Sequence, residues 1–202
     1  MTEPSSAGAR SRGRPKTFDR DRALEVAVRT WWVDGPQVSV NEIARRAGVS
    51  KAGLYREFGD EDGLVAAALD RYRTEVLLPR FDAMASDDPF PVVLDRLIVL
   101  ATGGADLPDG CLLANLRAAP DRLGSSSAQR VAEVGDEQRS HLTAFFARAA
   151  SRAEANWDID AVEAGAFLDA QLTFVLLRMA WGDPPDVVRQ HARLALSPLR
   201  AD

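Results

Sequence analysis

Small, hydroxyl-bearing and basic side chains occur together in one short segment between Gly48 and Gly59, and this segment is predicted to form a helix. The polar face of this stretch carries Lys51, Ala52, Gly53, Tyr55 and Arg56. A DNA major groove admits a helix whose leading end carries small residues and hydrogen-bond donors, and an arginine there can bind one guanine through two hydrogen bonds. These residue types therefore indicate contact with DNA bases and phosphates.

The segments around this stretch follow the helix-turn-helix plan. Ser39 and Glu42 form a capping box, in which the Ser39 hydroxyl accepts from the amide three residues on and Glu42 reaches back to the Ser39 amide. The helix that it opens ends at Gly48, and Ser50 is placed to cap the next one. Apolar residues three and four apart predict an earlier helix between positions 19 and 34.

Charge is divided unevenly along the chain. The 202 residues carry a net charge of −5, yet residues 1–59 hold eleven basic and seven acidic side chains, a surplus of four positive charges. The negative net charge of the whole chain argues against a nucleic-acid partner. The positive surplus in residues 1–59 instead indicates that contact with phosphates is confined to this N-terminal part. Arg10, Arg12, Arg14 and Lys16 alternate with small residues, which favours an extended arm that either contacts DNA or only solubilises the chain.

Two stretches resemble the TetR/AcrR family of bacterial transcriptional regulators. Arg12-Gly13-Arg14-Pro15 followed by Phe18-Asp19 is one, and the run from Ile43 to Phe58 is close to the signature I-A-x-x-A-G-V-S-x-x-x-L-Y-x-x-F. The resemblance implies an all-α fold of about nine helices. Its expected parts are a basic arm over 1–17, a three-helix helix-turn-helix DNA-binding domain over 18–62, and a larger helical effector-binding and dimerisation domain over 63–202.

The resemblance also implies a function, namely a regulator that binds a palindromic operator as a homodimer. Repression, relieved by a small lipophilic effector, is the expected mode. On the matching positions, Ala52, Gly53 and Arg56 are expected to approach base edges. The residues expected at phosphates or a neighbouring minor groove are Ser39, the exposed one of Arg45 and Arg46, Lys51, Tyr55, Arg12, Arg14 and Lys16.

The sequence departs from the family where the fourth helix begins. The family usually has Ser-Lys-Glu there, with the lysine on a phosphate, whereas this chain has Asp60-Glu61-Asp62. Acidic residues suit the positive end of a helix dipole but repel a DNA backbone. No phosphate contact is therefore expected at Glu61.

Beyond residue 63 the sequence is helical in pattern, without the strict alternation that predicts a sheet. Helices are expected over 64–85 with an interruption near Pro79, and then over 90–101, 111–119, 128–156, 160–181 and 187–199. The 160–181 segment is apolar around most of its circumference, so it must be covered nearly all round. Because the family pairs its last two helices across a dimer, the expected interface residues are Phe167, Phe174, Leu177, Val187 and Leu194.

The middle helices of the family enclose an effector pocket. Its expected lining is Phe81, Met84, Phe90, Leu94, Leu97, Cys111, Leu112, Leu116, Phe145, Phe146 and Trp157. Apolar and aromatic side chains suit a lipophilic ligand, and they would equally fill a dry core.

Other functions find little support in the sequence. The two histidines, His141 and His191, have no metal-ligand spacing, and no enzyme, cofactor or metal site is expected. A constitutive DNA-binding protein without ligand is the main alternative, followed by a thiol sensor through Cys111 and, remotely, a small hydrolase. With neither a membrane-length apolar run nor an apolar leader near Met1, we expect a cytoplasmic protein without membrane contact.

Overall fold

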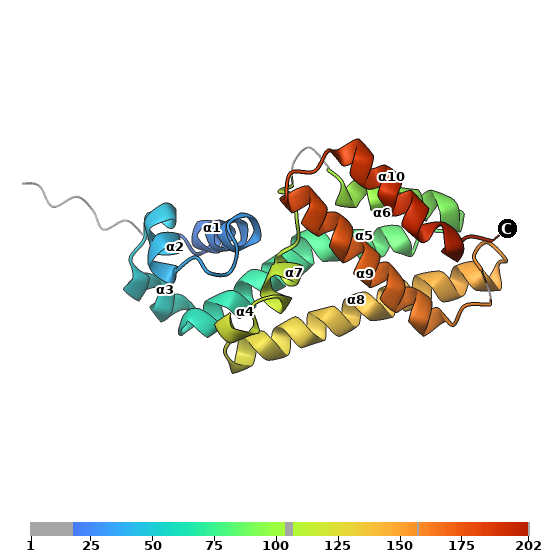
Figure 1. Ribbon diagram of the computed structural model, residues 1–202. Coiled ribbons are helices and arrows are strands. Elements are labelled where there is room, and N and C mark those ends of the chain that lie inside the picture. The colour runs from blue at the N-terminus through green and yellow to red at the C-terminus, as the bar shows by residue number, and fades with distance from the viewer. Residues whose placement is uncertain (1–17, 104–106, 157, 202) are drawn as a thin grey trace, which may run out of the picture.

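The structure is a computed structural model that describes residues 18–103, 107–156 and 158–201. Within these ranges the chain is helical, apart from turns and one isolated antiparallel bridge between Ala155 and Arg200 (Figure 1). The expected all-α fold is therefore confirmed. The expected contacts of Arg12, Arg14, Lys16 and Trp157 fall outside the described residues. Within the described ranges, no helix combines the length and the apolar character that a membrane crossing requires.

Three helices pack at the N-terminal end: α1 (Arg20–Val33), α2 (Val40–Ala47) and α3 (Lys51–Phe58). Each begins at a side-chain cap, and the Ser50 hydroxyl accepts from the Gly53 amide at 3.0 Å to start α3. Gly48 ends α2 with φ of 69°, a left-handed conformation that favours glycine and allows the tight turn into α3. Trp31, Ile43 and Leu54, at most 1% exposed, close the core of this three-helix unit.

A long helical segment leaves this unit and runs into the rest of the molecule. It consists of α4 (Glu61–Tyr72), one π-helical turn, η1 (Arg73–Leu77), and α5 (Leu78–Met84). The sequence predicts an interruption near Pro79, and the structure places it in the preceding turn. Proline has no amide hydrogen and its ring collides with the carbonyl four residues earlier, so the helix widens there to accommodate it.

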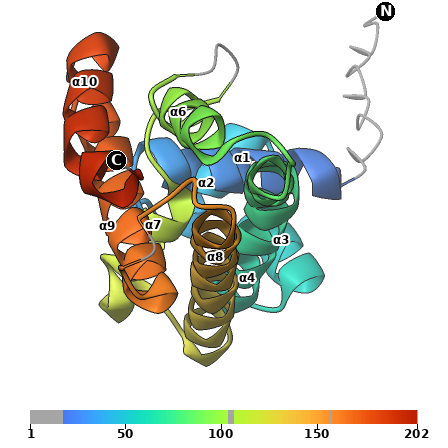
Figure 2. The ribbon, with the colours of Figure 1, turned by 90° about the vertical axis from the view of Figure 1, so that its right-hand side faces the viewer.

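The remaining helices form the larger part of the molecule. They are α6 (Phe90–Ala101), α7 (Leu112–Arg117), α8 (Ser125–Ser151), α9 (Ala161–Ala180) and α10 (Pro185–Leu196), with single 3₁₀ turns η2 (Pro120–Arg122) and η3 (Ser197–Leu199). Figure 2 shows α8 nearly end-on, between α4 and α9. The expected helix over 90–101 is confirmed, whereas α8 begins three residues before the predicted position 128 and ends five residues before 156.

Both ends of α8 have a structural cause. Ala153 has φ of 55°, which ends the helix shortly after Ser151. At the other end the Asp62 carboxylate, from the first turn of α4, accepts from the Ser126 amide at 2.8 Å and the Ser127 amide at 2.9 Å, and also from the Ser127 hydroxyl. The cap of α8 is thus supplied by a residue more than sixty positions away.

Two further side chains hold the three-helix unit against the larger part. Asn115 of α7 donates to the Trp32 carbonyl at 2.8 Å and the Trp31 carbonyl at 3.3 Å, at the end of α1. Arg122 donates to the Pro36 carbonyl at 3.4 Å and pairs with Glu61 at 3.2 Å. We call Asp62, Asn115 and Arg122, with the groups that they bind, the junction.

The cap on α8 predicts a pH-dependent contribution to stability. Partial burial opposes ionisation of Asp62, but hydrogen bonds from Ser127 and Ser126 outweigh it and lower the pKa of the carboxyl. Asp62→Ala should cost about 1–2 kcal/mol at pH 7 in urea denaturation, as the loss of a helix cap does. Because the folded-state pKa is lowered, this difference should persist above about pH 4 and vanish as pH falls through that lower pKa.

The control is Glu61→Ala, which removes an adjacent charge of the same sign. Glu61 forms an ion pair with Arg122, and both side chains are more than a third exposed. The substitution should therefore lower the free energy of unfolding by about 0.5 kcal/mol or less. Equal losses for the two variants would contradict the role of Asp62 as a distant cap.

Candidate nucleic-acid interface

The outward face of α3 presents a cluster of small and basic groups. Lys51, Ala52 and Arg56 are exposed and Tyr55 is half-buried, with the Lys51 ammonium 5.0 Å from the centre of the Tyr55 ring. Across the part of the chain that the structure describes, neither Lys51 nor Arg56 forms an ion pair. Both cations are therefore available for an external acceptor.

Gly53 lies differently from the other residues of this face. It is buried, and a Cβ atom at this position would lie 3.2 Å from the Phe18 ring and 3.1 Å from the Ser50 hydroxyl. Together with Phe18, Ser50 and Arg56 it lines a groove at the start of α1 and α3. The absence of a side chain lets Phe18 pack close to α3 at this point.

The basic residues at the end of α2 are tied to acidic partners. Glu42 accepts from Arg45 at 2.7 and 2.6 Å and from Arg46 at 2.8 Å, and Arg46 also pairs with Asp34. Hydrogen bonds first from Arg45 and then from Arg46 lower the pKa of Glu42 to about 2. Both arginines are exposed, the Arg45 side chain at 72% and the Arg46 side chain at 38%, so Arg45 is the more exposed of the two.

The capping box forms only in part. The Ser39 hydroxyl accepts from the Glu42 amide at 3.4 Å, as predicted. The reciprocal bond from the Ser39 amide to the Glu42 carboxylate is absent among the described residues, because the two arginines occupy that carboxylate. This half of the prediction was wrong: the i+3 and i+4 arginines compete for the same oxygens.

All three acidic residues at the start of α4 bind groups of the protein itself. Asp60 accepts from the Gly63 amide at 2.8 Å and caps α4, while Glu61 and Asp62 belong to the junction. The run is thus satisfied internally by specific hydrogen bonds and an ion pair, whereas the sequence indicated only that its charges suit the helix dipole.

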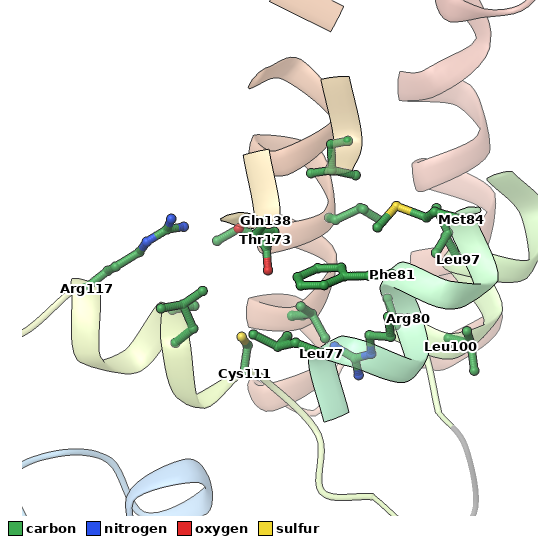
Figure 3. A pocket seen from close by; sticks show the side chains of 16 residues that line it. Leu77, Arg80, Phe81, Met84, Leu97, Leu100, Cys111, Arg117, Gln138 and Thr173 are labelled. Carbon is green, nitrogen blue, oxygen red and sulfur yellow. The ribbon is translucent and has the colours of Figure 1, made fainter. Parts of the chain in front are cut away.

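A small cavity of about 50 Å³ lies among α5, α6, α7, α8 and α9 (Figure 3). Four of the residues expected to line an effector pocket line it: Phe81, Met84, Leu97 and Cys111. Six others are buried elsewhere in the core, namely Phe90, Leu94, Leu112, Leu116, Phe145 and Phe146.

The position of these residues away from the cavity has a packing reason. The Phe90 ring lies 5.0 Å from the ring of Phe145 and 6.1 Å from that of Phe146, so the three aromatics fill one another's space. Sequence reasoning selected apolar residues, so it missed all four polar residues of the lining, and it also missed eight of the apolar ones. The missed residues are Leu77, Arg80, Leu100, Ala101, Leu113, Ala114, Arg117, Gln138, Leu142, Leu172, Thr173 and Leu176.

Cys111 lies at the edge of this cavity and is 6% exposed. It is the residue before the first turn of α7, and its sulfur accepts from the Tyr72 hydroxyl at 3.3 Å. Burial above all raises the pKa of Tyr72 well beyond its usual value, so that hydroxyl stays protonated as a donor. The thiol is thus packed as a small core residue.

Apolar side chains lie exposed along α9 and α10. Among the expected interface residues, Phe167, Phe174 and Leu194 are 38%, 49% and 73% exposed, while Leu177 and Val187 are half-buried. Val162 and Trp181, which the sequence analysis did not select, are 65% and 69% exposed. We call the five exposed residues the α9–α10 apolar face.

Comparisons with known proteins agree on one family. The family model described as bacterial regulatory proteins, tetR family, matches residues 23–68. Over 124 residues the chain is 32% identical to the HTH-type transcriptional repressor ComR of Escherichia coli K12, a match covering 56% of this chain and 57% of that protein. The chain thus spans little more than half of the curated relative that it matches.

Solved structures share the fold over nearly the whole chain. A mutant of the TetR family regulator CifR, complexed with 26-base-pair operator DNA, has a TM-score of 0.79 at 21% identity and covers 93% of this chain and 100% of its own. A TetR family regulator from Agrobacterium tumefaciens has a TM-score of 0.79 at 18% identity, covering 90% and 97%.

The pairing of Arg45 with Glu42 predicts a variant with stronger non-specific DNA binding. Glu42→Gln leaves the hydrogen bond from the residue 42 amide to the Ser39 hydroxyl in place but removes the carboxylate that pairs with Arg45. Arg45 can then bind a DNA phosphate without first breaking an ion pair. Affinity for arbitrary duplex DNA should rise severalfold, and the slope of log affinity against log salt should steepen by up to about 1. Glu25→Gln makes the same charge change at an exposed site on α1 and should have a smaller effect. Equal effects would show that net charge alone is responsible.

Proposed function

Because the chain belongs to the tetR family of bacterial regulatory proteins, we propose that this transcriptional regulator is a repressor released from a palindromic operator by a small molecule. One observation carries the proposal: α3 exposes Lys51, Ala52 and Arg56 at its surface. Among the described residues, Lys51 and Arg56 form no ion pair. That combination provides base and phosphate donors on one short helix.

The roles of these side chains follow from their chemistry. Arg56 has the planar fork that binds guanine through two hydrogen bonds, and Ala52 leaves room for a thymine methyl group. Lys51, Tyr55, Ser39 and Arg45 carry donors suited to phosphate oxygens, which position a protein without reading sequence. Gly53 has no side chain to contact DNA. Its role is to leave the space in which the Phe18 ring packs against α3.

The α9–α10 apolar face supports a homodimer. Phe174 and Trp181, with ring centres 6.5 Å apart, and Leu194 are large apolar groups exposed on the two C-terminal helices. Exposed apolar area of this kind is stabilised by burial against a second copy. A dimer would hold two α3 helices about 34–36 Å apart, the spacing of successive major grooves on one side of DNA.

Release by a ligand has a physical route through α7. Leu113, Ala114 and Arg117 of this helix line the cavity, and Asn115 between them binds the end of α1. A ligand that displaces α7 would shift the three-helix unit through the junction and alter the separation of the two α3 helices. Couplings of this sort are typically about 1–3 kcal/mol.

The size of the cavity favours a second candidate, a constitutive regulator without ligand. Ligand sites usually enclose roughly 300–1,000 Å³, whereas this cavity measures about 50 Å³. Selection of bound genomic fragments, followed by a release screen on those fragments, separates the two candidates. Loss of operator binding with a small molecule supports the ligand-responsive regulator, and an operator that no compound releases supports the constitutive one.

Substitutions on α3 should separate base reading from phosphate binding. Arg56→Ala should cost about 1–3 kcal/mol and relax preference at one base position, because it removes a bidentate base contact. Lys51→Ala should weaken binding to all sequences alike and reduce the salt slope by about 1. Competition binding on single-base variants of the selected operator provides the measurement. Equal losses on every sequence for both variants would rule out Arg56 as the base-reading residue.

The dimer should depend on the α9–α10 apolar face. Leu194→Glu places a charge at the most exposed of its residues and should shift the protein toward monomer, with a matching loss of affinity for the full palindrome. Val99→Glu, at a residue of α6 that is 43% exposed, is the control and should leave the mass unchanged. Sedimentation equilibrium reports the state. If the Leu194→Glu variant formed a dimer as stable as that of the unmodified protein, the dimer interface would not include the α9–α10 apolar face.

A further inference from the structure

Two arginines interrupt the apolar lining of the cavity. Arg117 enters from α7 and extends toward the side where Gln138 and Thr173 lie, while Arg80 enters from α5 (Figure 3). The rest of the surface is formed mainly by leucines, Phe81 and Met84. The Arg117 side chain is 28% exposed overall, but one of its nitrogens is buried, and burial of a charged donor is costly without an acceptor.

Arg117 has an incomplete set of partners. Its Nη1 lies 3.5 Å from an Asp169 oxygen, and that carboxylate also accepts from Gln138 through its other oxygen. Its Nη2 is buried and has no hydrogen-bond acceptor within the described ranges. A Cβ atom at residue 135 would lie 2.0 Å from this nitrogen, so Gly135 of α8 provides the space that the guanidinium occupies.

The balance of charge at the cavity is positive. Arg80 is half-buried and makes no ion pair within the part of the chain that is described. Asp169 is the carboxylate facing Arg117, and Glu137 nearby is held by Arg73 at 2.5 Å. Two arginines thus line the cavity, and the carboxylate paired with one of them, Asp169, does not line it; this favours an anion as the acceptor that Arg117 Nη2 lacks.

We propose that the effector is an amphiphilic carboxylate, with its anionic end at Arg117 and a short apolar body among Phe81, Met84 and Leu97. The inference rests on the proposed function, in which this cavity is the effector site. About 50 Å³ admits only a few heavy atoms beyond the contacts already made. Flexible side chains such as Met84 must therefore move to admit a longer body.

A matched ligand series tests the charge preference on the unmodified protein. Hexanoate, 1-hexanol and hexylammonium share one apolar chain and differ at the polar end. From ligand-dependent shifts in melting temperature, the dissociation constant of hexanoate should be about tenfold below that of hexanol. A charge-assisted hydrogen bond accounts for a difference in affinity of this size. Hexylammonium should give no shift. Equal stabilisation by hexanol or hexylammonium would overturn the proposal.

Variants assign the preference to one side chain. Arg117→Gln should bind hexanoate and hexanol equally, and Arg117→Lys should recover part of the preference by restoring the charge. Arg139→Gln, the same charge change at an exposed site on α8, should behave as the original protein. Retention of the full hexanoate preference in a folded Arg117→Gln protein would exclude Arg117 as the anion-binding residue.

Operator binding measured in the same solutions separates this proposal from the proposed function. Hexanoate that binds through Arg117 but leaves operator affinity unchanged would support the ligand class and contradict release by a ligand at this cavity. Release of the operator by an uncharged compound, with no hexanoate binding, would contradict the ligand class and leave the ligand-responsive regulator standing.

Discussion

The arrangement of this protein depends on one carboxylate that serves two helices. Asp62 lies in the first turn of α4, directly after the three-helix unit, and it accepts the free amides at the start of α8. Unpaired amides at a helix start need an acceptor, and here the acceptor comes from α4, the helix that directly follows α3. The position of α3 is consequently fixed relative to the longest helix of the larger part, and not only by contacts within its own three helices.

The junction places the cavity and α3 in one mechanical unit. Asn115 binds the end of α1 from the same six-residue helix whose Leu113, Ala114 and Arg117 line the cavity, and Arg122 joins the turn after α1 to Glu61. Packed elements of this kind move as blocks because interiors are dense and close to incompressible. Under the proposed function, a change of shape at the cavity would therefore reach α1 and α4 without a long chain of separate contacts.

Much of this arrangement was predictable from the sequence, and the exceptions have physical causes. Local signals placed α2, α3 and α6, because caps, glycine turns and apolar spacing act over a few residues. The start of α8 was missed because its cap comes from Asp62, and the partner of Glu42 was missed because Arg45 and Arg46 compete with the Ser39 amide. Cavity residues such as Arg117 could not be selected by hydrophobicity. Base reading by Arg56 stays a prediction from its residue type and its exposed position on α3.

The proposed function requires two α3 helices to read the two halves of one palindrome. Selection of bound sequences from a random duplex DNA library tests it most directly, because the library supplies no bias toward symmetry. We predict an enriched inverted repeat whose half-sites lie about one helical turn, 34–36 Å, apart. An enriched motif without inverted symmetry, or no enrichment above non-specific binding, would contradict the account.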